Sequence, residues 1–151
     1  MRICSILATF FVCVASLGCA RQPEPPPFKP RASVLQIMEG PLGHAAEVYW
    51  GSVSTVVDKD GIHENFPQND EAWEAVWAAG VTIGESGNLL MMGDRAKDDG
   101  EWMRLASALV DVGMEAAAAG EAKNPEKVLE VGEQVYNVCT ECHMKYIPEE
   151  E

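Results

Sequence analysis

Positive charge is scarce in this sequence of 151 residues, which contains 11 Lys and Arg residues against 24 Asp and Glu residues. The resulting formal net charge of −13 repels phosphate backbones and excludes general nucleic-acid binding. It also disfavours electrostatic docking on anionic lipid. A protein partner with a basic face is the kind of partner that this charge favours.

Cysteine is also sparse, which excludes a disulfide-rich scaffold. Of the five cysteines, Cys4 and Cys13 lie in a segment that we expect to be removed, and Cys19, Cys139 and Cys142 remain. The sequence has no nucleophile and base at a recognisable spacing, so we do not predict an enzyme. It has no internal repeat, and its length, with 47% hydrophobic residues, suits one domain.

No apolar run is long enough for a membrane-spanning helix, which needs roughly 20 residues. The run from Ile3 to Leu17 follows Arg2 and ends in small residues, as the apolar region of a signal peptide does. The end of this run resembles a bacterial lipobox at Cys19. We therefore predict that residues 1–18 are a signal peptide of the lipoprotein type and that Cys19 is lipidated. Plain secretion and an uncut anchor are the alternatives.

The segments that flank the predicted domain have simple compositions. Residues 19–30 contain five prolines, which favour an extended, semi-rigid tether, although a disordered N-terminus would have the same composition. Residues 149–151 form an acidic tail, which we interpret as a solvated end, with docking of a basic partner protein as the alternative. Together these features place the domain in the periplasm, tethered to the membrane through Cys19.

The body of the chain, residues 31–148, repeats apolar residues at steps of three and four, which predicts an all-α, antiparallel four-helix bundle. No segment shows a convincing period of two. A turn is expected at residues 58–61, and His63 is expected in a loop. The four expected helices cover residues 31–57, residues 69 or 70 to 91, residues 99–120 and residues 124–148.

Glycine and proline mark special positions in two of these helices. Gly40 and Pro41 interrupt the first helix and predict a kink. Gly80, Gly84 and Gly87 lower the helix propensity of the second helix. We interpret these three glycines as sites where a neighbouring helix or a flat cofactor approaches closely.

One motif near the C-terminus carries chemistry. Cys139, Cys142 and His143 form the CxxCH pattern of c-type haem attachment. Two thiols on one side of a helical turn can reach the two vinyl groups of one haem, and the histidine supplies an axial ligand to the iron. This attachment takes place outside the bacterial cytoplasm, in agreement with the predicted signal peptide.

Three other uses of these cysteines are weaker. A redox dithiol normally follows a strand in a βαβ unit, which is not expected here. A zinc site would need two more ligands, and His44 and His63, the remaining histidines, lie far apart in sequence. A disulfide between Cys139 and Cys142 would be strained within a helix.

An exported four-helix bundle with CxxCH in its last helix resembles the class II cytochromes c, which include the cytochromes c prime and their low-spin relatives. The resemblance covers residues 31–146. It implies one covalent haem c, held through Cys139 and Cys142, with His143 as an axial iron ligand. It also implies that Arg31 pairs with a haem propionate and that Leu35 or Met38 faces the sixth position of the iron.

The sixth position decides the function. A Met38 thioether would suit an electron carrier, whereas Leu35 over an open iron would suit a protein that binds nitric oxide or carbon monoxide. A haem-free helical interaction module is the third alternative. We expect the four tryptophans in the core or at a subunit interface, which leaves a homodimer open. The weaker ligand candidates are Met91, Met92 and His44.

Overall fold

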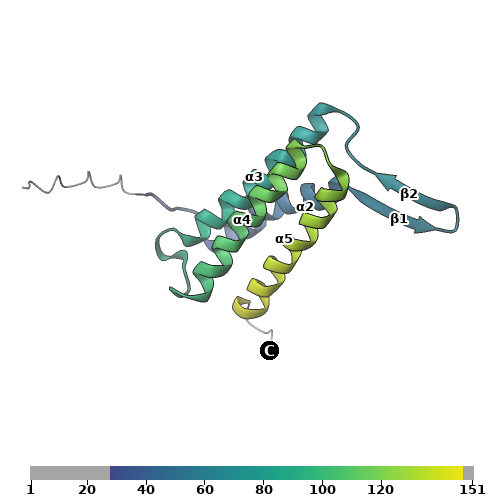
Figure 1. Cartoon of the computed structure of the whole chain (residues 1–151). Coiled ribbons are helices and arrows are strands. Elements are labelled where there is room, and N and C mark those ends of the chain that lie inside the picture. The colour runs from purple at the N-terminus through teal and green to yellow at the C-terminus, as the bar shows by residue number, and fades with distance from the viewer. Residues whose placement is uncertain (1–27, 148–151) are drawn as a thin grey trace, which may run out of the picture.

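The computed structural model describes residues 28–147, so the predicted signal peptide, Cys19, most of the tether and the acidic tail lie outside the described residues. The described chain is mostly helical and carries a small two-stranded sheet (Figure 1). Its elements are, in order, α1 (Val34–Ile37), the π-helical turn η1 (Met38–Leu42), α2 (Gly43–Ser52), β1 (Ser54–Asp58), β2 (Gly61–Asn65), α3 (Asp70–Met91), the 3-10 turn η2 (Gly93–Arg95), α4 (Glu101–Glu121) and α5 (Pro125–Tyr146).

The first predicted helix is broken into three segments. It starts at a capping box, in which the Ser33 hydroxyl accepts from the Gln36 backbone N–H at 3.1 Å. The backbone then leaves helical geometry at Gly40, with φ −96° and ψ −109°, just before Pro41, which cannot donate a backbone hydrogen bond. The predicted kink is confirmed. The predicted end at residue 57 is wrong, because α2 stops at Ser52.

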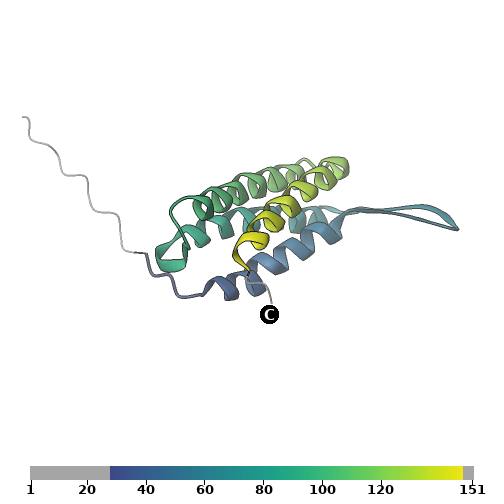
Figure 2. The same ribbon diagram turned by 90° about the horizontal axis from the view of Figure 1, so that it is seen from below.

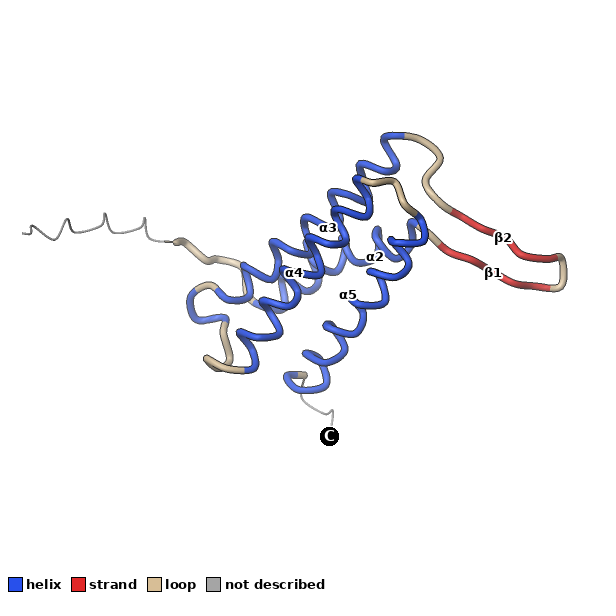
Figure 3. Tube along the Cα trace, in the orientation of Figure 1, coloured by secondary structure: helices blue, strands red, loops and turns tan. Residues whose placement is uncertain are grey.

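Residues 54–65 form an antiparallel β-hairpin, which corrects the all-α prediction. Figures 1 and 3 show the hairpin projecting away from the helices. All residues of β2 are exposed, and in β1 only Ser54 is partly covered. The turn at residues 58–61 is confirmed: the Asp58 carboxylate accepts from the Asp60 backbone N–H at 2.8 Å, and Gly61 has φ +132°. His63 lies in β2 rather than in a loop.

Helices α3 and α4 lie antiparallel and approach each other closely along a line of small residues (Figure 1). A Cβ atom on Gly80 would lie 2.2 Å from the backbone nitrogen of Ala117, and one on Gly113 would lie 2.2 Å from that of Gly84. Side chains there would force the helices apart. The close approach predicted for the glycines of this helix is therefore confirmed, and the neighbour is α4 rather than a flat cofactor.

The starts of α3 and α5 follow from their caps, as predicted. The Asn69 side chain accepts from the Ala72 backbone N–H at 2.9 Å, and the Asn124 side chain accepts from that of Lys127 at 2.9 Å. Pro125 occupies the first turn of α5, where its missing N–H costs nothing. The two longest described helices therefore begin where their sequences place them.

The core is built from one apolar side of each long helix, in agreement with the predicted steps of three and four. On α4 the buried side runs from Trp102 to Ala116. On α3, Val76 and Ile83 are buried, while Trp77 is 41% exposed. On α5, Val131 is buried, while Tyr136 is 59% exposed.

The helices pack in a closed arrangement in which α3 contacts α2 and α4, and α5 contacts α4 and α2. Figures 1 and 2 show α5 diverging from α4 toward its C-terminal end, where it comes near α2 and the start of the first helix. No helix within residues 28–147 has the length and apolar character needed to cross a membrane. The divergence of α5 sets the position of the candidate site.

Candidate functional site

The CxxCH motif lies in the last two turns of α5. Cys139 and Cys142 are partly buried, both are free thiols, and His143 is exposed. The helix continues past the motif, because the backbone N–H of Ile147 donates to the carbonyl of His143 at 3.0 Å. The two thiols and the imidazole are thus carried on one regular helical surface.

Two cavities meet at this motif. The larger has a volume of about 770 Å³ and the smaller about 260 Å³. Met38, Trp102, Cys142 and His143 line both of them. The volume of the larger cavity lies within the range of roughly 300–1,000 Å³ that is typical of sites for small molecules and cofactors.

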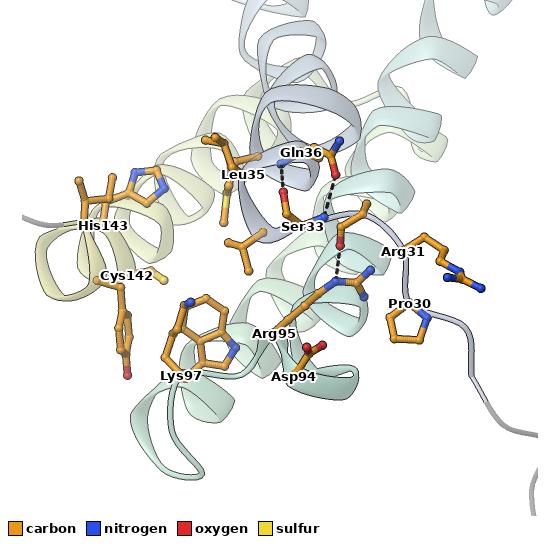
Figure 4. Close-up of a pocket in the computed structure, with 16 residues that line it drawn as sticks. Pro30, Arg31, Ser33, Leu35, Gln36, Asp94, Arg95, Lys97, Cys142 and His143 are labelled. Atoms are coloured by element: carbon orange, nitrogen blue, oxygen red, sulfur yellow. Dashed lines mark hydrogen bonds between the residues drawn. The ribbon is translucent and has the colours of Figure 1, made fainter.

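The larger cavity brings together most of the residues predicted from the sequence. Arg31, Leu35 and Met38 reach it from the start of the first helix, and Cys142 and His143 reach it from α5 (Figure 4). Leu35 is 63% exposed and lies at the rim, whereas Met38 is partly buried. Residues about 100 positions apart therefore share one cavity.

The smaller cavity has predominantly apolar walls. Cys139 lines it together with the facing surfaces of η1, α2, α4 and α5. Apolar walls beside two cysteines and a histidine are the surroundings that suit the flat, apolar body of a haem. Its apolar lining residues are Leu42, Ala46, Trp50, Leu90, Leu105, Ala106, Leu109 and Val138.

Trp102 forms a rigid wall between the two cavities. Its indole N–H donates to the carbonyl of Leu90 at 2.9 Å, and its ring packs edge to face with Tyr146 at a centroid distance of 5.0 Å. Trp73 is also buried, which confirms the core prediction for these two tryptophans. Trp50 is 40% exposed and donates to the carbonyl of Gly132 at 2.9 Å, so it joins α2 to α5.

Arg95 is the functional candidate that the sequence interpretation missed. It is 7% exposed and lines the larger cavity, whereas the predicted propionate partner, Arg31, is exposed. In Figure 4, Arg31 lies beside Pro30 on the side opposite His143, while Arg95 lies between them. Nothing in the local sequence distinguishes Arg95, because its burial arises from contacts with segments that are distant along the chain.

Burial raises the pKa values of both cysteines of the motif. For Cys139 the second cause is Cys142, and for Cys142 it is the carboxylate of Glu141. A catalytic dithiol needs the opposite change, a lowered thiol pKa. No group of three His, Cys, Asp or Glu side chains that could hold a metal ion occurs among residues 28–147. The raised thiol pKa values therefore do not favour a redox dithiol.

Polar contacts fasten the C-terminal end of α5 to the start of α4. The Tyr146 hydroxyl donates to the Asp98 carboxylate, and Arg104 pairs with Glu141 as well as with Glu101. Burial and the hydrogen bond to Asp98 together raise the pKa of Tyr146 to about 12. These contacts hold the motif in place next to the cavities.

No family model, no curated protein and no solved structure matches the chain. The weaker ligand candidates, Met91, Met92 and His44, line neither of the two cavities. The functional interpretation therefore depends on the motif, the two cavities and the residues that line them.

Proposed function

We propose that the protein is a mono-haem c-type cytochrome of the class II type that acts as an electron carrier rather than as an enzyme. The observation that carries this proposal is the CxxCH motif on α5, which lines two adjoining cavities, the larger of them of cofactor size. When bound, the haem supplies a one-electron couple at its iron. The protein then has to hold the group, orient it and control its exposure to water.

Each residue of the motif has a distinct role in this proposal. Cys139 and Cys142 would hold the haem through thioether bonds, and His143 would supply one axial ligand. The apolar smaller cavity would cover the body of the group and exclude water there. His143 is exposed, and the larger cavity opens beside it, so electrons would enter and leave on this side of the molecule.

Met38 is the residue that would make the protein an electron carrier. It is partly buried, it lines both cavities together with His143, and it lies in η1 just before the break at Gly40. Thioether ligation raises the reduction potential and favours electron transfer. Leu35 lines only the larger cavity, and it supports the second candidate function, in which an open iron position binds nitric oxide or carbon monoxide.

The remaining parts of the proposal concern the environment of the protein. The net charge of −13 favours a redox partner with a basic face. The predicted signal peptide and Cys19 place the cytochrome in the periplasm, tethered to the membrane by lipid. A homodimer is compatible with the partly exposed Trp50 and Trp77.

Optical spectra of the purified protein, oxidised, reduced and reduced with carbon monoxide, test the proposed function. An electron carrier with Met38 bound to iron should be low-spin in both oxidation states and should not react with carbon monoxide. A high-spin spectrum with immediate binding of carbon monoxide would support the gas-binding candidate instead. A protein without any haem absorption after maturation would contradict both.

A further inference from the structure

Arg95 carries a buried positive charge beside the larger cavity. Its Nε donates to the carbonyl of Ala32 at 2.9 Å, and one terminal nitrogen donates to the carbonyl of Leu89 at 2.9 Å. A guanidinium group has five N–H donors, so three of them are left after these two bonds. One dashed line in Figure 4 runs from Arg95 to the segment just before α1 and marks its hydrogen bond to the Ala32 carbonyl.

No carboxylate among residues 28–147 lies within ion-pair distance of Arg95. The nearest acidic residues in sequence are Asp94, which lines the same cavity without pairing, and Asp98, whose oxygens accept from two backbone N–H groups and from Tyr146. A buried charge without a counter-charge is costly. An anionic ligand bound in the larger cavity would supply the missing counter-charge to Arg95.

We propose that Arg95 is the carboxylate-binding residue of the larger cavity and that its ligand is a haem propionate. This inference rests on the proposed function. Cys142 and His143 line the cavity that Arg95 lines, so a group held by the motif shares its walls with this guanidinium. The planar fork of an arginine matches the two oxygens of a carboxylate. Arg95 thus takes the role that the family resemblance assigned to Arg31.

Burial is the reason for preferring Arg95 to the other cations of the cavity. Arg31 and Lys97 also line it, but both are exposed, and water screens their charges. Arg95 is 7% exposed and is already fixed by two backbone carbonyls, so it needs no reordering to bind. A pre-positioned, weakly screened donor binds an anion more strongly than a mobile surface residue does.

Two variants of Arg95 and one of Arg31, all prepared as the full chain with haem attached, test the inference. Resonance Raman spectroscopy reports hydrogen bonding to propionates through their bending band, and potentiometry reports the charge near the iron. We expect Arg95→Gln to shift the propionate band and lower the midpoint potential, because a positive charge beside the haem favours the reduced state. Arg95→Lys keeps the positive charge, so its midpoint potential should stay close to that of the wild type, while its propionate band should shift. Arg31→Gln should change both the potential and the band less.

Added acetate distinguishes a propionate from a free anion. If a propionate occupies Arg95, acetate at constant ionic strength should change neither the Raman band nor the melting temperature of the wild-type protein. A melting temperature that rises with acetate in the wild type but not in Arg95→Lys would overturn the inference, because a free carboxylate would then occupy the site. So would an unchanged propionate band in both Arg95 variants, or a larger shift in Arg31→Gln.

Different results would contradict the attachment of haem and the role of Arg95. If the matured wild-type protein contains no covalent haem, the proposed function and the role of Arg95 fall together. If the haem is attached but the Arg95 variants leave the propionate band unchanged, only the role of Arg95 falls. If Arg95→Gln does not accumulate as folded protein, the comparison of Arg95→Lys with Arg31→Gln still decides the question.

Discussion

At the scale of single residues, the side chains around His143 would determine whether the proposed cytochrome carries electrons or binds gases. Leu35 in α1 and Met38 in η1 both line the larger cavity, but they differ in burial and in chemistry. Met38 is a partly buried thioether, and Leu35 is an exposed alkyl group at the rim. Replacement of each by alanine therefore separates ligation from simple packing.

The first prediction concerns Met38. If its sulfur binds iron, Met38→Ala should remove the weak near-infrared band of iron–methionine ligation, lower the midpoint potential and allow carbon monoxide to bind. Leu35→Ala is the matched control and should leave the ligation band in place. A wild-type protein that is high-spin, and whose spectrum Met38→Ala does not change, would refute methionine ligation and favour the gas-binding function.

The second prediction concerns the hydrogen bond between Tyr146 and Asp98. Donation by Tyr146 is the largest cause of the lowered Asp98 pKa, whereas the pKa of Tyr146 rises from 10.0 to about 12 through burial first and this hydrogen bond second. The lowered pKa of Asp98 contributes stability above pH 3.8, the ordinary pKa of this carboxyl group. This stability is lost as the pH falls through the pKa of Asp98 in the folded protein. The raised phenol pKa contributes stability below pH 10, and this is lost as the pH rises toward about 12.

Tyr146→Phe should therefore lower the melting temperature near pH 7 and change it less at pH 2 and at pH 12. Thermal unfolding followed by circular dichroism at these three pH values measures the difference. The control is Tyr136→Phe, since Tyr136 lies on the same helix, is exposed and donates no hydrogen bond within the described residues. If Tyr146→Phe lowered the melting temperature by the same amount at all three pH values, the hydrogen bond between Tyr146 and Asp98 would not be the source of the stability.

The site could be predicted from the sequence only where local spacing determines it. Cys139, Cys142 and His143 form a motif within five positions, so their shared helical surface could be foreseen. The approach of Met38 to His143 could be expected only through the family resemblance. Arg95 could not be predicted, because its burial depends on a contact with Ala32 that spans 63 positions of the chain.

At the scale of the secondary-structure elements, the contact between α3 and α4 is the most extensive among the described helices. Glycine at positions 80, 84, 113 and 120 lets the two backbones approach so closely that a Cβ at Gly113 would meet the backbone of Gly84 and Ile83. Backbone atoms cannot move aside as the end of a flexible side chain can. The register of the two helices is therefore fixed by small residues.

The third prediction tests this contact. Gly113→Ala should destabilise the protein by about 3 kcal/mol or more, at the upper end of the cost of overpacking. Gly51→Ala is the control, because nothing lies within 4 Å of the new Cβ and alanine favours a helix by up to about 1 kcal/mol. Urea unfolding of the two variants measures both effects. Equal stability of the two variants would show that the helices do not approach this closely.

The β-hairpin and the buried side of α3 could not be predicted from local sequence patterns, for physical reasons. The hairpin of β1 and β2 is exposed on both faces, so its residues show no alternation of apolar and polar types that a period of two could reveal. On α3 the contact with α4 is made by glycines, which carry no apolar signal, and Trp77 is turned partly to solvent whereas Trp73 is buried. The caps at Asn69 and Asn124 are local, so the starts of α3 and α5 were predicted.

At the scale of the whole molecule, charge and location decide which partners the protein can meet. The net charge of −13 creates a long-range field that attracts a basic partner and weakens as salt is added. The divergence of α5 from α4 places the motif and both cavities at one end of the fold, and the hairpin projects from the opposite end in Figure 1. A partner that exchanges electrons would dock at the end that carries the motif.

The fourth prediction concerns the membrane tether. If Cys19 is lipidated, Cys19→Ala should move the protein from the membrane fraction to the soluble fraction without changing its absorption spectrum, because several acyl chains hold a protein firmly and their loss releases it. Cell fractionation with immunodetection measures the distribution. A wild-type protein already found in the soluble fraction would identify residues 1–18 as an ordinary secretory signal.

The most direct test of the central claim is the intact mass of the chain, measured under denaturing conditions after expression with a c-type maturation system. The wild type should carry the added mass of one haem, since thioether bonds to Cys139 and Cys142 survive denaturation, and a variant with both Cys139→Ala and Cys142→Ala should carry none. A matured wild-type chain with the mass of the polypeptide alone would contradict the claim and leave a haem-free helical interaction module as the explanation.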